Sequence, residues 1–266
     1  MLLAACLLSA CTTLPTPQQR RGTAESLAAA RGWRLEALNA GALPLAAILP
    51  VDPVKSEHLA IYIEGDGLAW IGASRISPDP TPIDPLALRL ALVHPGSAAA
   101  YLGRPCQYVA DGRCKAAYWS GARFAPDVVS ATGSAVELLK ARFGATRLTL
   151  VGYSGGAAVA MLVAARRTDV ARVVTVAGNL DHQAWTSFHR MDPLTGSLNP
   201  ADAPASFTQW HFVGQDDTVI PPRLVQAYAQ RYKGRARPTV RVVPGFDHHC
   251  CWAANWPRLW NDMESH

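Results

Sequence analysis

The chain has 266 residues, of which 49% are hydrophobic and 17% charged, enough to bury one substantial core. Its net charge of +5 comes from 25 basic and 20 acidic residues, and no run of lysine and arginine concentrates it. This thin spread, without zinc-finger spacing or an aromatic RNA-binding motif, argues against a nucleic-acid-binding protein and indicates an ordinary solvated surface.

The N-terminal sequence MLLAACLLSAC combines a short apolar run with cysteines. The run is too short to span a bilayer and is typical of an export signal. Its end, LSAC at residues 8–11, resembles the lipobox of bacterial lipoproteins. The resemblance implies cleavage before Cys11, lipidation of its thiol, and a protein anchored to the periplasmic side of the inner or outer membrane. The alternatives are the same pattern ending at Cys6 and a frayed apolar terminus without a signal function.

The composition changes only near the N-terminus, so we expect one domain. Residues 1–11 are assigned to the lipoprotein-type signal segment. Residues 12–30, which open with prolines and glutamines, are predicted to be a tether, and residues 31–266 the folded domain.

Apolar periodicity and turn residues predict strands that alternate with helices from residue 59 onward. Strands are expected at residues 59–63, 98–102, 147–151, 170–176, 207–213 and 239–243, and helices at residues 85–93, 127–143, 157–165, 221–232 and 256–263. This alternation indicates an α/β fold with a mostly parallel sheet and helices on both faces. Ligands bind such sheets at the carboxyl ends of the strands.

Four cysteines follow the N-terminal segment. Cys106 and Cys114 enclose a short segment with an Asp-Gly turn, a spacing that suits a loop-closing disulfide in an oxidising compartment. Cys250 and Cys251 are adjacent, and the sequence leaves open whether they bond to each other, pair with the other two or stay reduced. The spacings fit no zinc pattern, so no metal site is expected.

The segment GYSGG, residues 152–156, joins a predicted strand to an alanine-rich helix. A corner this tight holds its central residue in a strained conformation, and only small neighbours avoid a clash. The free amides at the start of the helix favour negative charge at the same point. The pattern therefore predicts Ser154 as an exposed nucleophile, with a plain strand–helix turn as the alternative.

A serine nucleophile needs a base, and the base needs an orienting acid. The segments HFVGQDDTVIPP and VRVVPGFDHHCCW supply aspartates and histidines after two later strands. The order Ser, Asp, His is that of the α/β-hydrolases. From about residue 59 onward the chain resembles that superfamily, and the segments YIEGDGLAW, YLGRPCQY, AGNLD, SLNP and HHCCW resemble a group of bacterial lipoprotein α/β-hydrolases.

The resemblance implies a role for each residue of the triad. Ser154 matches the nucleophile. Asp217 matches the acid because it stands three residues after a glycine and precedes a Val-Ile-Pro segment, and His248 matches the base because it follows the spacing Gly-x-x-His. Alternatives remain: a turn or helix-cap role for Asp217, Asp216 or Asp181 as the acid, and His249 as the base.

Acyl transfer also needs two amide donors for the oxyanion. Gly155, directly after the nucleophile, is expected to supply one, and Asp66 or Gly67 the other. The lipase pattern has His-Gly-Gly in this loop, whereas here Glu64 and Asp66 bring carboxylates close to the developing charge. They must point away, be held by a cation such as Arg104, or recognise a cationic substrate group. This departure argues against long neutral lipids as substrates.

Two further features have competing interpretations. Trp70, Trp119 and Trp185 either line an acyl pocket or pack in the core and at its rim. Residues 181–204 form either a short cap over the site or a surface loop.

Together these patterns predict a membrane-tethered serine hydrolase acting on a small or medium ester, thioester or amide. No organic cofactor or metal is implied, and no nucleic-acid partner is expected. A non-catalytic binding or scaffold lipoprotein on the same fold is one alternative, and a serine peptidase is another.

Overall fold

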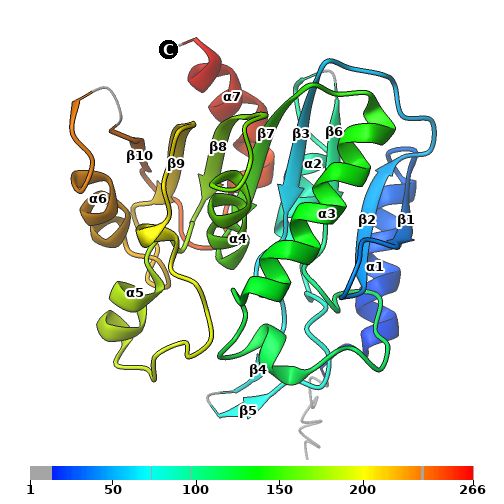
Figure 1. The fold of residues 1–266 in the computed structure, drawn as a ribbon, viewed down its shortest axis with the longest axis horizontal. Helices are drawn as coiled ribbons and strands as arrows, with labels where there is room; N and C mark the ends of the chain where they lie inside the picture. Colours follow the sequence, from blue (N-terminus) through cyan, green and yellow to red (C-terminus); the bar gives the residue numbers. More distant parts are fainter. Residues whose placement is uncertain (1–13, 73, 97, 235–236, 266) are drawn as a thin grey trace, which may run out of the picture.

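The computed structural model describes residues 14–72, 74–96, 98–234 and 237–265. The predicted signal segment and Cys11 lie outside these residues. The main feature is an eight-stranded sheet in the order β1-β2-β6-β3-β7-β8-β9-β10, shown in Figure 1. Its strands are β1 (Trp33–Leu38), β2 (Leu45–Pro50), β3 (His58–Ile63), β6 (Ala99–Leu102), β7 (Arg147–Tyr153), β8 (Val170–Val176), β9 (Thr208–Gly214) and β10 (Thr239–Val243).

The sheet is parallel from β6 to β10, as the alternation of strands and helices predicts. Strand β2 runs in the opposite direction to its two neighbours, because it pairs antiparallel with both β1 and β6. A separate small hairpin pairs β4 (Trp70–Ile71) with β5 (Arg75–Ile76). Because the parallel strands end at one edge, the loops after β3, β7, β9 and β10 gather there.

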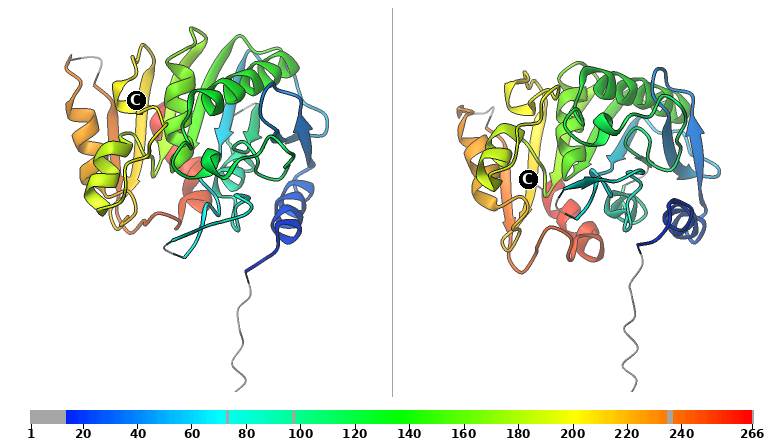
Figure 2. Two further views of the ribbon diagram at one scale, coloured as in Figure 1. Left: turned by 60° about the horizontal axis from the view of Figure 1, so that its bottom comes forward. Right: turned by 90° about the horizontal axis from the view of Figure 1, so that it is seen from below.

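Helices cover both faces of the sheet, as Figures 1 and 2 show. One face carries α3 (Pro126–Phe143), α4 (Gly155–Ala164) and α6 (Pro222–Gln230), and the other carries α1 (Pro17–Ala29), α2 (Leu86–Ala91) and α7 (Trp252–Glu264). A further helix, α5 (His182–His189), lies at the carboxyl edge. The buried residues accordingly form two large apolar clusters, one on each side of the sheet.

The boundaries of two helices have clear local causes. Helix α3 begins with Pro126 and an acidic residue in its first turn, and it ends at Gly144, whose φ of 64° favours glycine. Helix α7 begins at Trp252, earlier than the predicted start at residue 256, and contains Pro257. Trp252, Trp256 and Trp260 recur at helical spacing and are buried, so packing of this face holds the first turn in place.

Helix α1 differs from the tether predicted for residues 12–30. Thr16 and Gln19 form a capping box at its start. Arg20 is buried, donates to the Thr81 carbonyl and forms an ion pair with Asp79 at 3.3 Å. Ala24 and Ala28 are fully buried against the sheet. The segment has low hydropathy, so the sequence gives little sign of a packed helix. In the structure, two small alanines and one arginine dock this helix against the rest of the protein.

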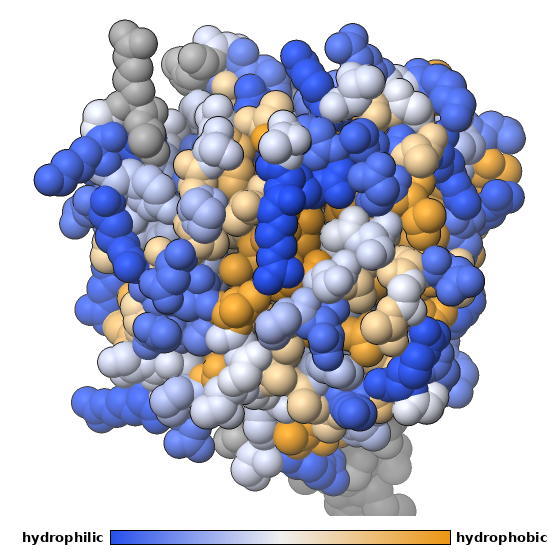
Figure 3. Space-filling model, viewed as in Figure 1, coloured by the Kyte–Doolittle hydropathy of each residue, from blue (hydrophilic) through white to orange (hydrophobic). Residues whose placement is uncertain are grey.

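On the face drawn in Figure 3 hydrophilic side chains predominate, and apolar ones reach the surface in small groups near its centre. Among the described residues, no helix combines the length and the apolar character needed to cross a bilayer.

Candidate active site

The corner between β7 and α4 presents Ser154. Its backbone has φ 50° and ψ −120°, a strained conformation for a residue with a side chain. A Cβ on Gly152 would overlap Ala157, and one on Gly156 would overlap the carbonyls of Ile63 and Glu64. Close packing of the strand, corner and helix therefore requires these glycines, as the GYSGG pattern predicts.

Ser154 stands at the end of a chain of three hydrogen-bonded groups. Its Oγ lies 3.1 Å from His248 Nε2, and His248 Nδ1 lies 2.9 Å from Asp217 Oδ2. The other oxygen of Asp217 accepts hydrogen bonds from the amides of Val219 and Ile220 at 2.8 and 2.7 Å. Since an ionised carboxylate only accepts, Nδ1 carries the imidazole proton and Nε2 is free to accept from the serine hydroxyl.

None of the alternative candidates is hydrogen-bonded to Ser154 or His248. Asp216 is exposed, and Asp181 caps α5 by accepting from the amides of Gln183 and Ala184. His249 is exposed, with Nδ1 3.1 Å from the Tyr153 hydroxyl. The structure therefore brings Asp217 and His248 to Ser154, and none of these three residues.

Tyr153, which precedes Ser154, supports the loop that carries His248. Its hydroxyl donates to the His248 carbonyl at 3.3 Å, and the rings of Tyr153 and His248 are 5.3 Å apart. Burial, with help from the nearby Glu64 charge, holds the pKa of Tyr153 well above its usual value, so the hydroxyl stays neutral. We did not single out this residue from the sequence, although its place in the Gly-x-Ser-x-Gly motif is a signal.

The loop after β3 carries two carboxyl groups with different environments. Asp66 is bridged by Arg104, with Nη1 3.1 Å from Oδ1, and by Arg123, with Nη1 2.5 Å from Oδ2. Burial alone would raise the pKa of Asp66, but the charges of Arg123 and Arg104 hold it below its usual value. Of the three possibilities left open for this carboxylate, the structure shows the one in which Arg104 holds it as a cation, and Arg123 is a second cation that the sequence does not indicate.

Glu64 is buried, and its Oε1 accepts a hydrogen bond from the Gly65 amide at 2.9 Å. Burial raises the pKa of this carboxyl to about 7. Glu64 therefore stays largely protonated at mildly acidic pH.

Two backbone amides are available beside Ser154. Among the described residues, neither the Gly155 amide at the start of α4 nor the Asp66 amide donates a hydrogen bond to another group. The Asp66 carboxylate packs against Gly155, since a Cβ added there would overlap it. The two predicted oxyanion donors therefore belong to segments in direct contact.

A cavity of about 270 Å³ lies next to Ser154. Its apolar wall comes from Leu68, Pro82 and Ile83, and its polar lining from Glu64, Asp66, Asp84, Tyr153, His248 and His249. A larger cavity of about 530 Å³ lies at the amino ends of the strands, around His58 and Arg147, away from Ser154. The position of the smaller cavity makes it the candidate for binding the reacting group.

The three tryptophans considered for an acyl pocket do not line this cavity. Trp119 packs with Cys106 and Ala69 and donates to the Ser77 carbonyl at 2.9 Å, and Trp70 contacts the same cluster. Trp185, in α5, donates to the Val219 carbonyl at 2.9 Å. Residues 181–204 likewise contribute nothing to the cavity lining and pack beside the loop that carries Asp217.

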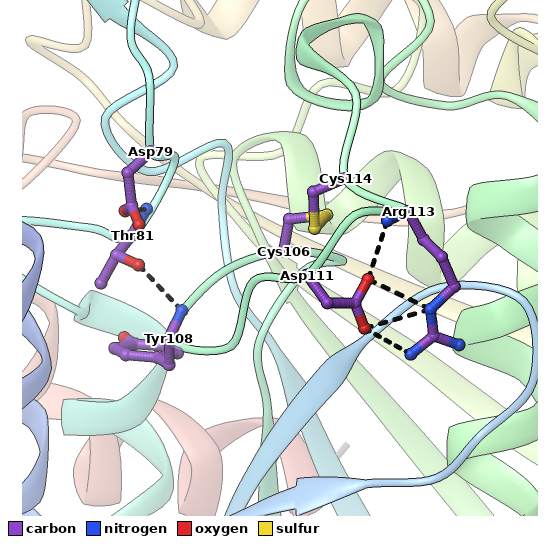
Figure 4. The surroundings of a disulfide bond; sticks show 7 residues. All are labelled: Asp79, Thr81, Cys106, Tyr108, Asp111, Arg113 and Cys114. Carbon is purple, nitrogen blue, oxygen red and sulfur yellow. Dashed lines mark hydrogen bonds and ion pairs between the residues drawn. A yellow bond between two sulfur atoms is a disulfide. The ribbon is translucent and has the colours of Figure 1, made fainter.

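A disulfide between Cys106 and Cys114, with 5.8 Å between their Cα atoms, closes the loop after β6, as Figure 4 shows. Beside it, Asp111 and Arg113 form an exposed ion pair, and the Tyr108 amide donates to the Thr81 hydroxyl at 2.8 Å. The adjacent residues Cys250 and Cys251 form a disulfide with each other, and the peptide bond between them is cis.

In the described part of the chain, no group of three or more His, Cys, Asp and Glu side chains is placed to hold a metal ion.

Comparison with known proteins bears on the fold. No family model matches the sequence, and no curated protein matches it. An α/β serine hydrolase homologue from Coxiella burnetii is 16% identical with a TM-score of 0.57, over 86% of this chain and 95% of its own. A serine hydrolase without a lid from Xanthomonas campestris is 17% identical with a TM-score of 0.55, over 86% and 94%.

An esterase from Pyrobaculum calidifontis has a TM-score of 0.61 at 14% identity, over 96% of this chain and 95% of its own. At such identities the likeness concerns architecture and not activity. With its eight-stranded, mostly parallel sheet and helices on both sides, the chain has the α/β-hydrolase fold.

Proposed function

We propose that the protein is a serine hydrolase that cleaves a small or medium ester, thioester or amide through an acyl-enzyme on Ser154. One observation carries this proposal: the hydrogen-bonded chain from Ser154 through His248 to Asp217, built on a strained corner between strand and helix. Strain of this kind persists only where the surrounding structure imposes it, and it is concentrated at functional sites.

The geometry supports a two-step mechanism. His248 Nε2 takes the proton from Ser154 as Oγ attacks the substrate carbonyl, and Asp217 stabilises the imidazolium without itself being protonated. The amides of Gly155 and Asp66 hold the oxyanion. When the tetrahedral intermediate collapses, His248 returns the proton to the leaving group, and a water activated by the same imidazole then releases the acyl group.

The size of the cavity favours a compact acyl group. At about 270 Å³ it lies just below the usual range for sites that bind drug-sized molecules. The structural neighbours include proteins described as esterases and one described as a serine hydrolase without a lid. We therefore expect short-chain esters to be better substrates than long-chain ones.

The first test is labelling with a fluorophosphonate probe, with Ser154→Ala as the control variant. Labelling of the wild type that disappears in the variant supports an activated serine. A folded wild type that stays unlabelled, and that hydrolyses neither short esters nor amides, would instead favour the non-catalytic binding protein. Cleavage of peptide amides in preference to esters would favour the peptidase.

We also propose that Cys11 is lipidated and tethers the protein to the periplasmic side of a membrane. The lipobox resemblance of residues 8–11 supports this, and the Cys106–Cys114 disulfide is compatible with an oxidising compartment. Mass spectrometry of the mature N-terminus tests it. Diacylglyceryl modification should be absent from Cys11→Ser and present in Cys6→Ser, and an unmodified N-terminus in the wild type would exclude the tether.

A further inference from the structure

We propose that Arg104 and Arg123, acting through the side chain of Asp66, are positioning residues of the oxyanion hole. We call these three residues the arginine clamp. The inference rests on the proposed serine hydrolase mechanism and adds to it two residues that touch neither the nucleophile nor the base.

The contacts of the clamp fix Asp66 from one side. Arg104 Nη1 lies 3.1 Å from one carboxylate oxygen and Arg123 Nη1 2.5 Å from the other. Both arginine side chains are about 5% exposed, and each guanidinium also donates to a backbone carbonyl: Arg104 to that of Arg123, and Arg123 to that of Ser120 at 2.7 Å. Buried charge-assisted hydrogen bonds of this kind fix an orientation strongly.

The rest of the loop is held from other directions. Gln107 Nε2 donates to the Gly65 carbonyl at 3.0 Å, and its Oε1 accepts from the Arg104 amide at 2.9 Å. Gly67 packs so closely on the Pro80 carbonyl that a Cβ would overlap it. The backbone of residues 65–67 therefore has little freedom, and the amide of Asp66 is aimed before substrate arrives.

Charge gives the clamp a second role. The Asp66 carboxylate packs against Gly155, whose amide is the other proposed oxyanion donor. An uncompensated carboxylate there would oppose the negative charge that develops in the transition state. Two guanidinium groups against one carboxylate leave a net charge of +1, which favours the oxyanion instead.

Removing one arm of the clamp should therefore slow chemistry more than it weakens binding. For Arg123→Met and Arg104→Met we expect kcat to fall by roughly 10- to 100-fold, less than the loss from deleting a direct donor, while KM changes by less than about threefold. Arg123→Lys keeps the charge with one contact and should recover part of the loss. The matched control is Arg113→Met. It removes an exposed arginine from the loop after β6, which also carries Arg104, and it should leave kcat unchanged.

The decisive experiment is a double-mutant cycle of Arg123→Met and Asp66→Asn, measured as kcat and KM on a short-chain p-nitrophenyl ester. If Arg123 acts through Asp66, the double variant should be no slower than the slower single variant. Circular dichroism and fluorophosphonate labelling report the folded fraction. Should Asp66→Asn fail to fold, the cycle is replaced by a comparison of kcat and KM among Arg123→Met, Arg123→Lys and Arg113→Met.

Three results would contradict the clamp: losses that multiply in the double variant, a change confined to KM, or a kcat for Arg123→Met equal to that of wild type. Each would leave the proposed hydrolase in place. A wild type without Ser154-dependent hydrolysis would overturn the proposed function, and the clamp with it.

Discussion

At the scale of single residues, the two carboxylate oxygens of Asp217 make different hydrogen bonds. One oxygen accepts from the amides of Val219 and Ile220, which is the local turn role that the sequence left open. The other oxygen holds His248. The turn therefore orients the carboxylate, and the two interpretations of this residue are compatible.

Replacing Asp217 with Asn should reduce kcat by roughly 10⁴-fold, the loss seen when the equivalent change favours the wrong imidazole tautomer in a serine protease. The amide can still accept from the two backbone groups, so the thermal midpoint should change little. Steady-state hydrolysis of a short ester measures the effect. Asp216→Asn, at an exposed neighbour, is the control, and a comparable loss there would contradict the assignment.

The residues of the proposed triad can be predicted from the sequence because each is marked locally. Ser154 has glycines on both sides, and Asp217 and His248 follow glycines at the ends of strands. Arg123 has no such signal. It meets Asp66 across 57 positions of sequence, and an arginine before a helix is more often a surface residue than a buried partner.

At the scale of elements, the loop after β6 that the Cys106–Cys114 disulfide closes connects the site to a small hydrophobic cluster. Cys106 packs with Trp119 and Ala69, and the same loop carries Arg104 and Gln107 to the residues after β3. The loop is thus a brace for the Asp66 segment, and its closure should matter to activity as well as to stability.

Replacing Cys106 and Cys114 together with serine opens a loop with a sequence separation of 8. Chain entropy predicts a loss of about 2 to 3 kcal/mol in the free energy of unfolding. Urea denaturation measures that loss. We expect kcat to fall in the folded variant, because the brace of the clamp is loosened. Unchanged kcat in a folded variant would show that the arginines hold Asp66 without the disulfide.

The predicted helices and strands from residue 59 onward were confirmed, because alternating apolar runs and glycine boundaries mark them locally. The elements that were not predicted have weak local signals. Strands β1 and β2 pair with each other across a short connection, and β2 joins the rest of the sheet through β6, so the partner that holds this pair in the sheet is distant in sequence. Helix α5 begins at the Asp181 cap, within a stretch that lacks clear periodicity.

At the scale of the whole molecule, a buried carboxyl at the end of a central strand gives stability a dependence on pH. The pKa of Glu64 is raised by burial from 4.5 to about 7. The folded state therefore retains a proton that the unfolded state has lost, and stability falls as the pH rises through this window.

From the size of the shift, the wild type should lose on the order of 3 kcal/mol of unfolding free energy between about pH 4.5 and pH 7 through this group. Glu64→Gln lacks the titration, so its stability should be much flatter over the same range. Urea midpoints of both proteins across the range measure the difference. Parallel curves would mean that folding leaves the pKa of Glu64 unchanged.

Helix α1 has a consequence for the supply of substrate. Its first turns are bonded to Asp79 and Thr81, in the segment that leads to the cavity wall at Pro82 and Ile83, and Figure 2 shows that it starts at the carboxyl edge of the sheet. Only residues 12–16 separate Cys11 from this helix, a span of roughly 20 Å when fully extended. An enzyme anchored at Cys11 would hold the start of α1 within that distance of the bilayer. For any substrate that itself lies at the lipid surface, the density of substrate in that layer would then set the rate of encounter.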